Sequence, residues 1–221
     1  MTSLLLVNMP WAGVDTASIQ VGLLKSVVAR RGFEVEDLYG NLDLLDWIDP
    51  VLYARIAQGD LPVLIGEWLF APWLHADGPG PARIARAEPY LDFLAERGRL
   101  PECVRETLLD LRDRAVPAYL DRMVESVDWR RFDAIGFSCV FSQAVPSLAL
   151  ARRIKAAHPD RTIAALAKGD RHVDGCRRFH SAQGIRRQVA SATAAHLQLA
   201  LAAAPALSRI DRRPGRLRHP V

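Results

Sequence analysis

Residues 3–10 read SLLLVNMP, and residues 33–39 read FEVEDLY. The first run is apolar and stops at Pro10, which is typical of a short buried strand. The second run alternates apolar and polar residues, as a half-covered strand does. Between them, residues 16–31 carry apolar side chains at helical spacing, and Gly32 follows as a helix stop. Together these segments predict a strand–helix–strand unit with parallel strands and a right-handed crossover.

The helix inside this unit is expected to be capped at its start by Asp15 or Thr16. Its apolar side chains predict a broad buried stripe that packs against the sheet. The residues of this predicted stripe are Ile19, Val21, Leu23, Leu24, Val27 and Val28.

A helical pattern fills residues 43–128, where repeated prolines divide the predicted helices. The predicted helices span residues 43–58, 62–75, 83–97 and 103–125. The segment is too apolar for a solvated linker, so we interpret it as a packed helical insertion. Its cluster around Trp68 and Trp73 is interpreted as core, with a hydrophobic wall facing a cofactor or partner as the alternative.

The strand and helix pattern returns at residues 129–167. Residues 134–140 predict a third strand, and a helix with Pro146 at or near its first turn runs to about Ala157. Residues 161–166 predict the start of a fourth strand. Beyond Ala167 the pattern fades: residues 184–204 have the composition of an Ala-rich helix, and disorder is expected after Pro205.

These segments predict an α/β protein with a Rossmann-like open parallel sheet and a large helical insertion. Residues 1–42 form the first βαβ unit and residues 43–128 the insertion. Residues 129–167 form the second βα unit and its strand. Residues 168–221 form an Arg- and Ala-rich tail that we interpret as aberrant or disordered.

Composition excludes several classes of protein. The net charge is +4, but residues 171–221 hold ten Arg and two acidic residues, so the tail alone carries +8. An aromatic-poor tail gives little support for base stacking, so nucleic acid is not an expected partner. The three cysteines, Cys103, Cys139 and Cys176, are too far apart for an iron–sulfur cluster motif. No stretch is long and apolar enough for a membrane span or a secretory signal, which predicts a cytoplasmic protein.

Open parallel sheets bind ligands beyond the carboxyl ends of their strands, near the switch in strand order. The loops at Asn8–Asp15 and Cys139–Pro146 are therefore the expected binding loops. The chain contains no P-loop, GxGxxG sequence or Ser–His–Asp grouping, and no catalytic residue is predicted. The candidate cofactor-binding residues are Asn8, Pro10, Trp11, Ser138, Phe141, Ser142 and Gln143.

Five segments follow one another along the chain: LLLVNMPW (4–11), GLLK (22–25), GEWLFAP (66–72), DAIGFS (133–138) and SLALARRIK (147–155). In this order they resemble the N-terminal region of the radical-SAM maturases that C-methylate ribosomally synthesised peptides. The resemblance covers about residues 3–165, and GEWLFAP is its most specific part.

The resemblance implies a cobalamin-binding Rossmann-like domain followed by a barrel that holds an iron–sulfur cluster and S-adenosylmethionine. This chain is expected to be truncated before that catalytic core, because it has no CxxxCxxC motif and so binds neither group. A corrinoid is the expected ligand, and the family usually binds it without a protein histidine. We therefore interpret His172, within a DxHxxG pattern at residues 170–175, as a solvated side chain instead of a cobalt ligand.

Two alternatives to a methyltransferase cofactor module remain open at this stage. The first alternative is a non-enzymatic interaction module. Such a module would bind either a precursor peptide or a radical-SAM core that belongs to another polypeptide. The third hypothesis is an Arg-rich nucleic-acid binder. The tail composition is also that of a frameshifted GC-rich reading frame, which is our preferred interpretation of residues 168–221.

Overall fold

The computed structural model describes residues 3–59, 61, 64–74, 88–139, 142–167 and 176–179. All of these residues belong to one unit, Met1–Ile185. The predicted tail helix at 184–204, Phe141 and His172 lie outside the described residues.

A single sheet organises this unit, with strand order β2-β1-β3-β4-β5. Its strands are β1 (Ser3–Asn8), β2 (Glu34–Tyr39), β3 (Ala134–Cys139), β4 (Thr162–Ala167) and β5 (Cys176–Phe179). The first four strands are parallel, which confirms the predicted α/β fold with a Rossmann-like open sheet. β5 was not predicted, and it pairs antiparallel with β4. The sequence pattern predicts β4 as the last strand of the sheet. In the structure its outer edge is paired with β5.

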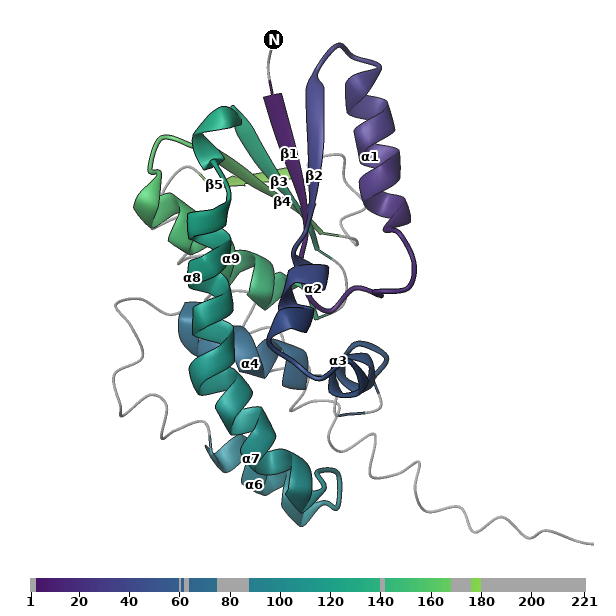
Figure 1. Ribbon diagram of the computed structural model, residues 1–221, viewed down its shortest axis with the longest axis vertical. Coiled ribbons are helices and arrows are strands. Elements are labelled where there is room, and N and C mark those ends of the chain that lie inside the picture. Colours follow the sequence, from purple (N-terminus) through teal and green to yellow (C-terminus); the bar gives the residue numbers. More distant parts are fainter. Residues whose placement is uncertain are drawn as a thin grey trace, which may run out of the picture. The chain divides into compact units, whose positions relative to one another are not determined.

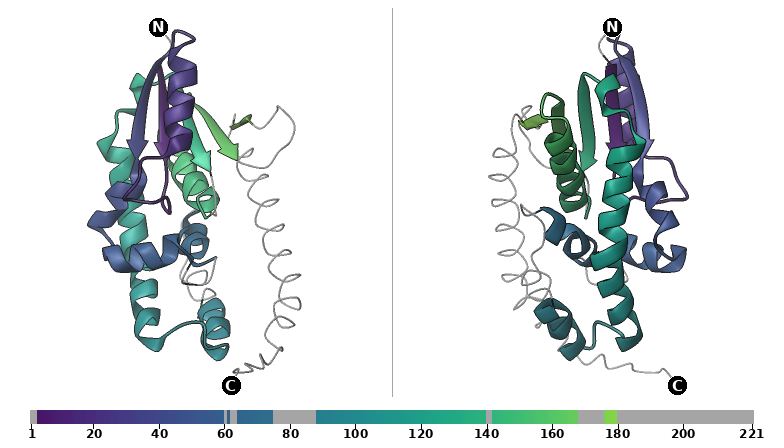
Figure 2. Two further views of the ribbon diagram at one scale, coloured as in Figure 1. Left: turned by 90° about the vertical axis from the view of Figure 1, so that its right-hand side faces the viewer. Right: turned by 60° about the vertical axis from the view of Figure 1, so that its left-hand side comes forward.

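Helices cover both faces of the parallel strands, as such sheets require. Helix α1 (Ile19–Ala29) lies on one face, against β1 and β2. Helices α8 (Val116–Ser126) and α9 (Ala144–Ala157) lie on the opposite face (Figures 1 and 2). The inner face of α9 is buried as predicted, through Leu148, Leu150 and Ile154.

Two expectations for α1 were wrong. Its N-cap is Ser18, whose hydroxyl accepts a hydrogen bond from the Val21 N–H, and neither Asp15 nor Thr16 caps it. Of the predicted buried stripe, Val21 alone is buried, whereas Ile19 and Leu23 are 78% and 62% exposed. The helical spacing was correct, but the covered face is narrower than predicted. Val21 is buried and Leu24 and Val28 are half-buried, whereas Ile19, Leu23 and Val27 face solvent.

The helical insertion begins with α2 (Gly40–Asp43) and a short 3₁₀ turn, Leu44–Asp46, directly after β2. The predicted helix 43–58 is thereby divided, because Asp49 caps a new helix whose first residue is Pro50. The other helices of the insertion follow the predicted ranges closely. They are α3 (Pro50–Ala57), α4 (Ile65–Leu74), α6 (Glu88–Glu96) and α7 (Glu102–Asp110).

A π-helical turn, Leu111–Ala115, joins α7 to α8 without a break in the helix. A 3₁₀ turn, Trp129–Arg131, precedes β3. Its first residue, Trp129, is fully buried. In Figure 1, α2, α3 and α4 lie beyond the ends of the strands at which β1 and β2 terminate. The insertion therefore covers the edge of the sheet at which open parallel sheets bind ligands.

Candidate functional site

The two predicted binding loops begin side by side. Asn8 at the end of β1 is paired in register with Ser138 of β3, and with Tyr39 of β2 on its other side. Strand order reverses between β1 and β3, because the chain moves from β1 to β2 in one direction and from β3 to β4 in the other. The loops therefore leave the sheet at its topological switch point, the usual ligand position in such folds.

A chain of buried amides links the three strand ends. The Gln143 Nε2 group donates to the Asn8 Oδ1 atom at 3.3 Å and also to the carbonyl of Met9. Asn8 Nδ2 donates to Asn41 Oδ1 at 3.2 Å, and Asn41 Nδ2 donates to the Gly13 carbonyl at 3.0 Å. Buried amides are stable only when they are paired in this way. This network fixes the loop after β1 to the starts of α2 and α9.

Trp11 anchors the same loop in the insertion. Its indole is 4% exposed and lies 5.1 Å from the Tyr53 ring and 6.3 Å from the Phe70 ring, measured between ring centroids. A Cβ atom on Gly66 would lie 2.5 Å from the Trp11 Nε1 atom, so the indole rests directly on the α4 backbone. The GEWLFAP segment that carries the sequence resemblance therefore contains the glycine that receives Trp11.

Two tyrosine hydroxyls also donate hydrogen bonds to backbone carbonyls at this edge of the sheet. The Tyr53 hydroxyl donates to the Ala12 carbonyl at 2.7 Å, and the Tyr119 hydroxyl donates to the Gly40 carbonyl at 3.0 Å. Burial raises the pKa of both phenols above the ordinary value, so both remain protonated donors. Burial likewise raises the pKa of Asp43, a shift that the nearby Arg122 opposes.

On the β3 side, the Ser138 hydroxyl donates to Gln20 Oε1 at 2.9 Å, which ties the strand to α1. Ser142 has a φ of 60°, in the left-handed region that a non-glycine residue seldom adopts, and it forms the turn before α9. Gln143 does not cap α9 through its side chain. Its amide is committed to Asn8 and Met9 instead.

Most of the predicted binding residues are buried at this edge: Asn8, Pro10, Trp11, Ser138 and Gln143. The hydrogen bonds of Asn8, Ser138 and Gln143 hold the loops in shape. Their assignment as cofactor-binding residues stays a prediction. The exposed part of the edge is residues 13–17, with partly exposed Ser142 beside the network.

No group of three or more potential metal ligands occurs among the residues that the structure describes. In that part of the chain the histidine present is His158, which follows α9 and precedes β4, away from the strand ends. Glu67 is partly buried in α4 and takes part in an interaction, as a buried acid requires. None of the described helices is long and apolar enough to cross a bilayer.

Comparison with known proteins adds no identity to this geometry. No family model, curated protein or solved structure matches the chain.

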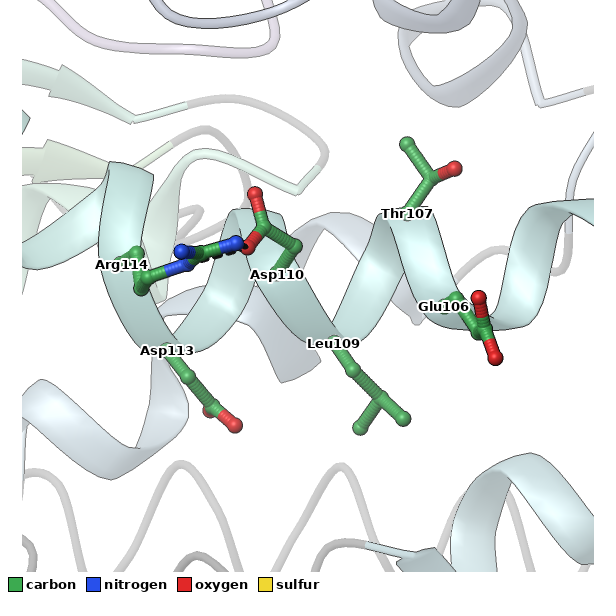
Figure 3. A pocket seen from close by; sticks show the side chains of 6 residues that line it. All are labelled: Glu106, Thr107, Leu109, Asp110, Asp113 and Arg114. Carbon is green, nitrogen blue, oxygen red and sulfur yellow. Dashed lines mark hydrogen bonds and ion pairs between the residues drawn. The ribbon is translucent and has the colours of Figure 1, made fainter.

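Two hollows lie on the insertion and not at the strand ends. One, of about 640 Å³, is an open surface depression on α7 and the π turn (Figure 3). Its residues Asp110 and Arg114 pair with each other, so their charges are already matched. The other, of about 220 Å³, lies between α3 and α7 and is lined by Leu52, Arg55, Cys103 and Val104 among others.

Sequence reasoning missed two functional candidates. Asn41 follows β2, and its place in the amide network was predictable because the carboxyl ends of parallel strands share one edge. Arg112 is 1% exposed, pairs with Asp113, and lies 4.6 Å from the Trp68 ring centroid. The π turn that directs Arg112 inward has no sequence signature, so this residue was detectable only in three dimensions.

Proposed function

We propose that this chain is a cofactor-binding module of the Rossmann-like type whose ligand is a corrinoid. The observation that carries the proposal is the parallel pairing of Asn8 with Ser138, which starts both loops at the switch point of the sheet. Open parallel sheets bind nucleotide-containing and tetrapyrrole-sized cofactors at this edge far more often than elsewhere. The choice of a corrinoid among such ligands comes from the sequence resemblance.

In this proposal the ligand lies against exposed Gly13, Thr16 and Ala17 and partly exposed Ser142, not against the buried amides. Gly13 permits close approach of the backbone, while Thr16 supplies a short polar side chain. The Asn8, Asn41 and Gln143 network would hold this surface in a fixed shape before the ligand arrives.

A bound corrinoid would supply methyl-carrying chemistry, which in the resembled enzymes is used to C-methylate a ribosomally synthesised peptide. The residues of this chain would bind and orient the group, and the resembled family usually does so without a protein histidine. In the resembled enzymes the iron–sulfur cluster and S-adenosylmethionine belong to the radical-SAM core, and the described residues of this chain would hold neither.

The test is titration of the purified chain with hydroxocobalamin, followed by the visible absorbance of the corrin. A saturable shift is expected, and Thr16→Trp, which fills the exposed loop surface, is expected to weaken it by at least about tenfold. The matched control is Glu34→Trp, an exposed residue at the opposite end of the strands, which should leave binding unchanged. Absence of any shift, or equal losses in both variants, would reject corrinoid binding at this edge.

A second candidate, a peptide-binding module, is favoured by the hollow between α3 and α7. The hollow combines apolar walls with Asp49 and Arg55, and its lining residue Val51 is 68% exposed. Displayed peptides selected on the wild-type chain should then fail to bind Val51→Asp. Peptides that bind both proteins equally would show that this hollow is not the site.

A further inference from the structure

The exposed face of α1 has the pattern of a helix interface. Ile19, Leu23 and Val27 follow one another at four-residue spacing and are 78%, 62% and 43% exposed. Between them lie Gly22 and Ser26, which are also exposed, and apart from its chain neighbours and the backbone of α1 no atom lies within 4 Å of where a Gly22 Cβ would be. Apolar residues at this spacing, with small residues alongside, are what a helix uses to pack closely on another helix.

From this face we propose that two copies of the chain associate through antiparallel packing of their α1 helices. In this arrangement Leu23 lies near the two-fold axis, and Ile19 of one copy lies opposite Val27 of the other. An isologous contact needs a surface that is complementary to itself, and a symmetric apolar row centred on Leu23 meets this need.

The charges at the two ends of α1 favour a second copy and select the antiparallel orientation. Exposed Arg30 and Arg31 follow the helix, exposed Asp15 precedes it, and α1 itself contains no acidic residue. The cation within the helix, Lys25, is already paired with Asp37 of β2. A parallel pair would bring four arginines together, whereas an antiparallel pair places each Arg30–Arg31 end near the partner's Asp15.

Two further exposed apolar residues flank the helix in the sequence. Val14 precedes α1 and is 38% exposed, and Phe33 follows it and is 41% exposed. Antiparallel packing brings the Val14 end of one copy to the Phe33 end of the other. One helix pair is smaller than a standard interface of about 1,600 Å², so the dimer is expected to be concentration-dependent, with a micromolar dissociation constant.

Sedimentation of the full-length chain across about 1 to 100 μM tests the proposal directly. A monomer–dimer equilibrium is expected, and Leu23→Glu should weaken it by at least about tenfold. Val51→Glu, at an equally exposed apolar residue of α3, is the control and should leave the dimer intact. A strictly monomeric wild-type chain, or a dimer unaffected by Leu23→Glu, would overturn the proposal.

Charge reversal gives a second, independent readout. Asp15→Arg alone, or Arg30→Asp with Arg31→Asp, should weaken self-association about two- to fivefold, as exposed ion pairs do. A mixture of the two variants should form heterodimers with wild-type affinity, because every facing pair is then again of opposite charge. If mixing restores nothing, the two ends do not face each other.

Cysteine crosslinking fixes the orientation, in a background with Cys103→Ser and Cys176→Ser. Chains with Ile19→Cys mixed with chains carrying Val27→Cys should form a mixed disulfide on mild oxidation, since antiparallel packing places these positions together. Preferential pairing of Ile19→Cys with itself would show a parallel contact and contradict the antiparallel dimer.

Discussion

The side-chain amide of Gln143 donates a 3.3 Å hydrogen bond to Asn8, a residue 135 positions earlier in the chain. The same amide also donates to the backbone carbonyl of Met9. These two bonds connect the N-cap residue of α9 to the end of β1, on the buried side of the proposed binding edge.

Replacing Gln143 with Leu should destabilise the chain by about 1–3 kcal/mol, because Asn8 and Met9 then have buried acceptors without this donor. Urea unfolding followed by circular dichroism measures the change. Gln58→Leu is the control, since Gln58 is exposed at the end of α3 and should change the free energy of unfolding little. Equal effects of the two substitutions would mean that the buried amide network contributes nothing special.

Gly66→Ala should destabilise the fold by about 1–3 kcal/mol, because the new methyl group meets the Trp11 indole at 2.5–2.6 Å. Gly22→Ala is the matched change in α1, where the space is open, and it should stabilise the chain by about 0.5–1 kcal/mol. Both are measured by chemical unfolding at sub-micromolar concentration. A neutral Gly66→Ala would show that Trp11 is free to leave α4.

Tyr119→Phe should cost about 1 kcal/mol at pH 7, since the hydrogen bond to the Gly40 carbonyl is lost. Burial raises the pKa of Tyr119, so the folded chain holds the phenol proton more tightly than the unfolded chain. The stability linked to this proton is complete below about pH 10, the ordinary tyrosine pKa, and falls as the pH rises further.

The stability gap between wild type and Tyr119→Phe should therefore narrow above pH 10. Unfolding curves collected from pH 7 to the alkaline limit of the assay measure this gap. A gap that stays constant with pH would show that the Tyr119 phenol titrates alike in both states.

Cys103 and Cys139 should differ in their rate of reaction with a thiol reagent. Cys103 is exposed, whereas Cys139 is buried, and burial raises the pKa of the Cys139 thiol, a shift that the neighbouring Ser147 opposes. In a Cys176→Ser variant, a thiol reagent should label Cys103 promptly and Cys139 only after denaturant is added. Prompt labelling of both in the native chain would mean that the α9 side of β3 opens readily.

The order of elements in the sheet was largely predictable. The apolar run at residues 3–9, the alternating run at 33–39 and the buried run at 134–140 all became strands close to the expected bounds. Local hydrophobic pattern and stop residues such as Gly32, with its φ of 83°, carry this information in the sequence itself. β5 was missed because its CRRF segment lacks a strand pattern, although it pairs with the strand that precedes it, β4.

The site was predictable in place and not in detail. Sequence reasoning put Asn8, Ser138 and Gln143 at one edge, and the structure adds the protein groups to which their side chains are hydrogen-bonded. Whether an amide faces a neighbour or a cofactor depends on what the insertion covers, and no local pattern records this.

The sequence by itself determined which segments are strands and helices and in what order they come, because periodicity and turn residues act over a few positions. Only the tertiary structure decided which face of each element is covered. Helix α1 shows this most clearly: its apolar spacing predicted a buried stripe, yet Ile19 and Leu23 are exposed. Periodicity specifies that two faces differ, but the packing of distant segments decides which face meets the sheet.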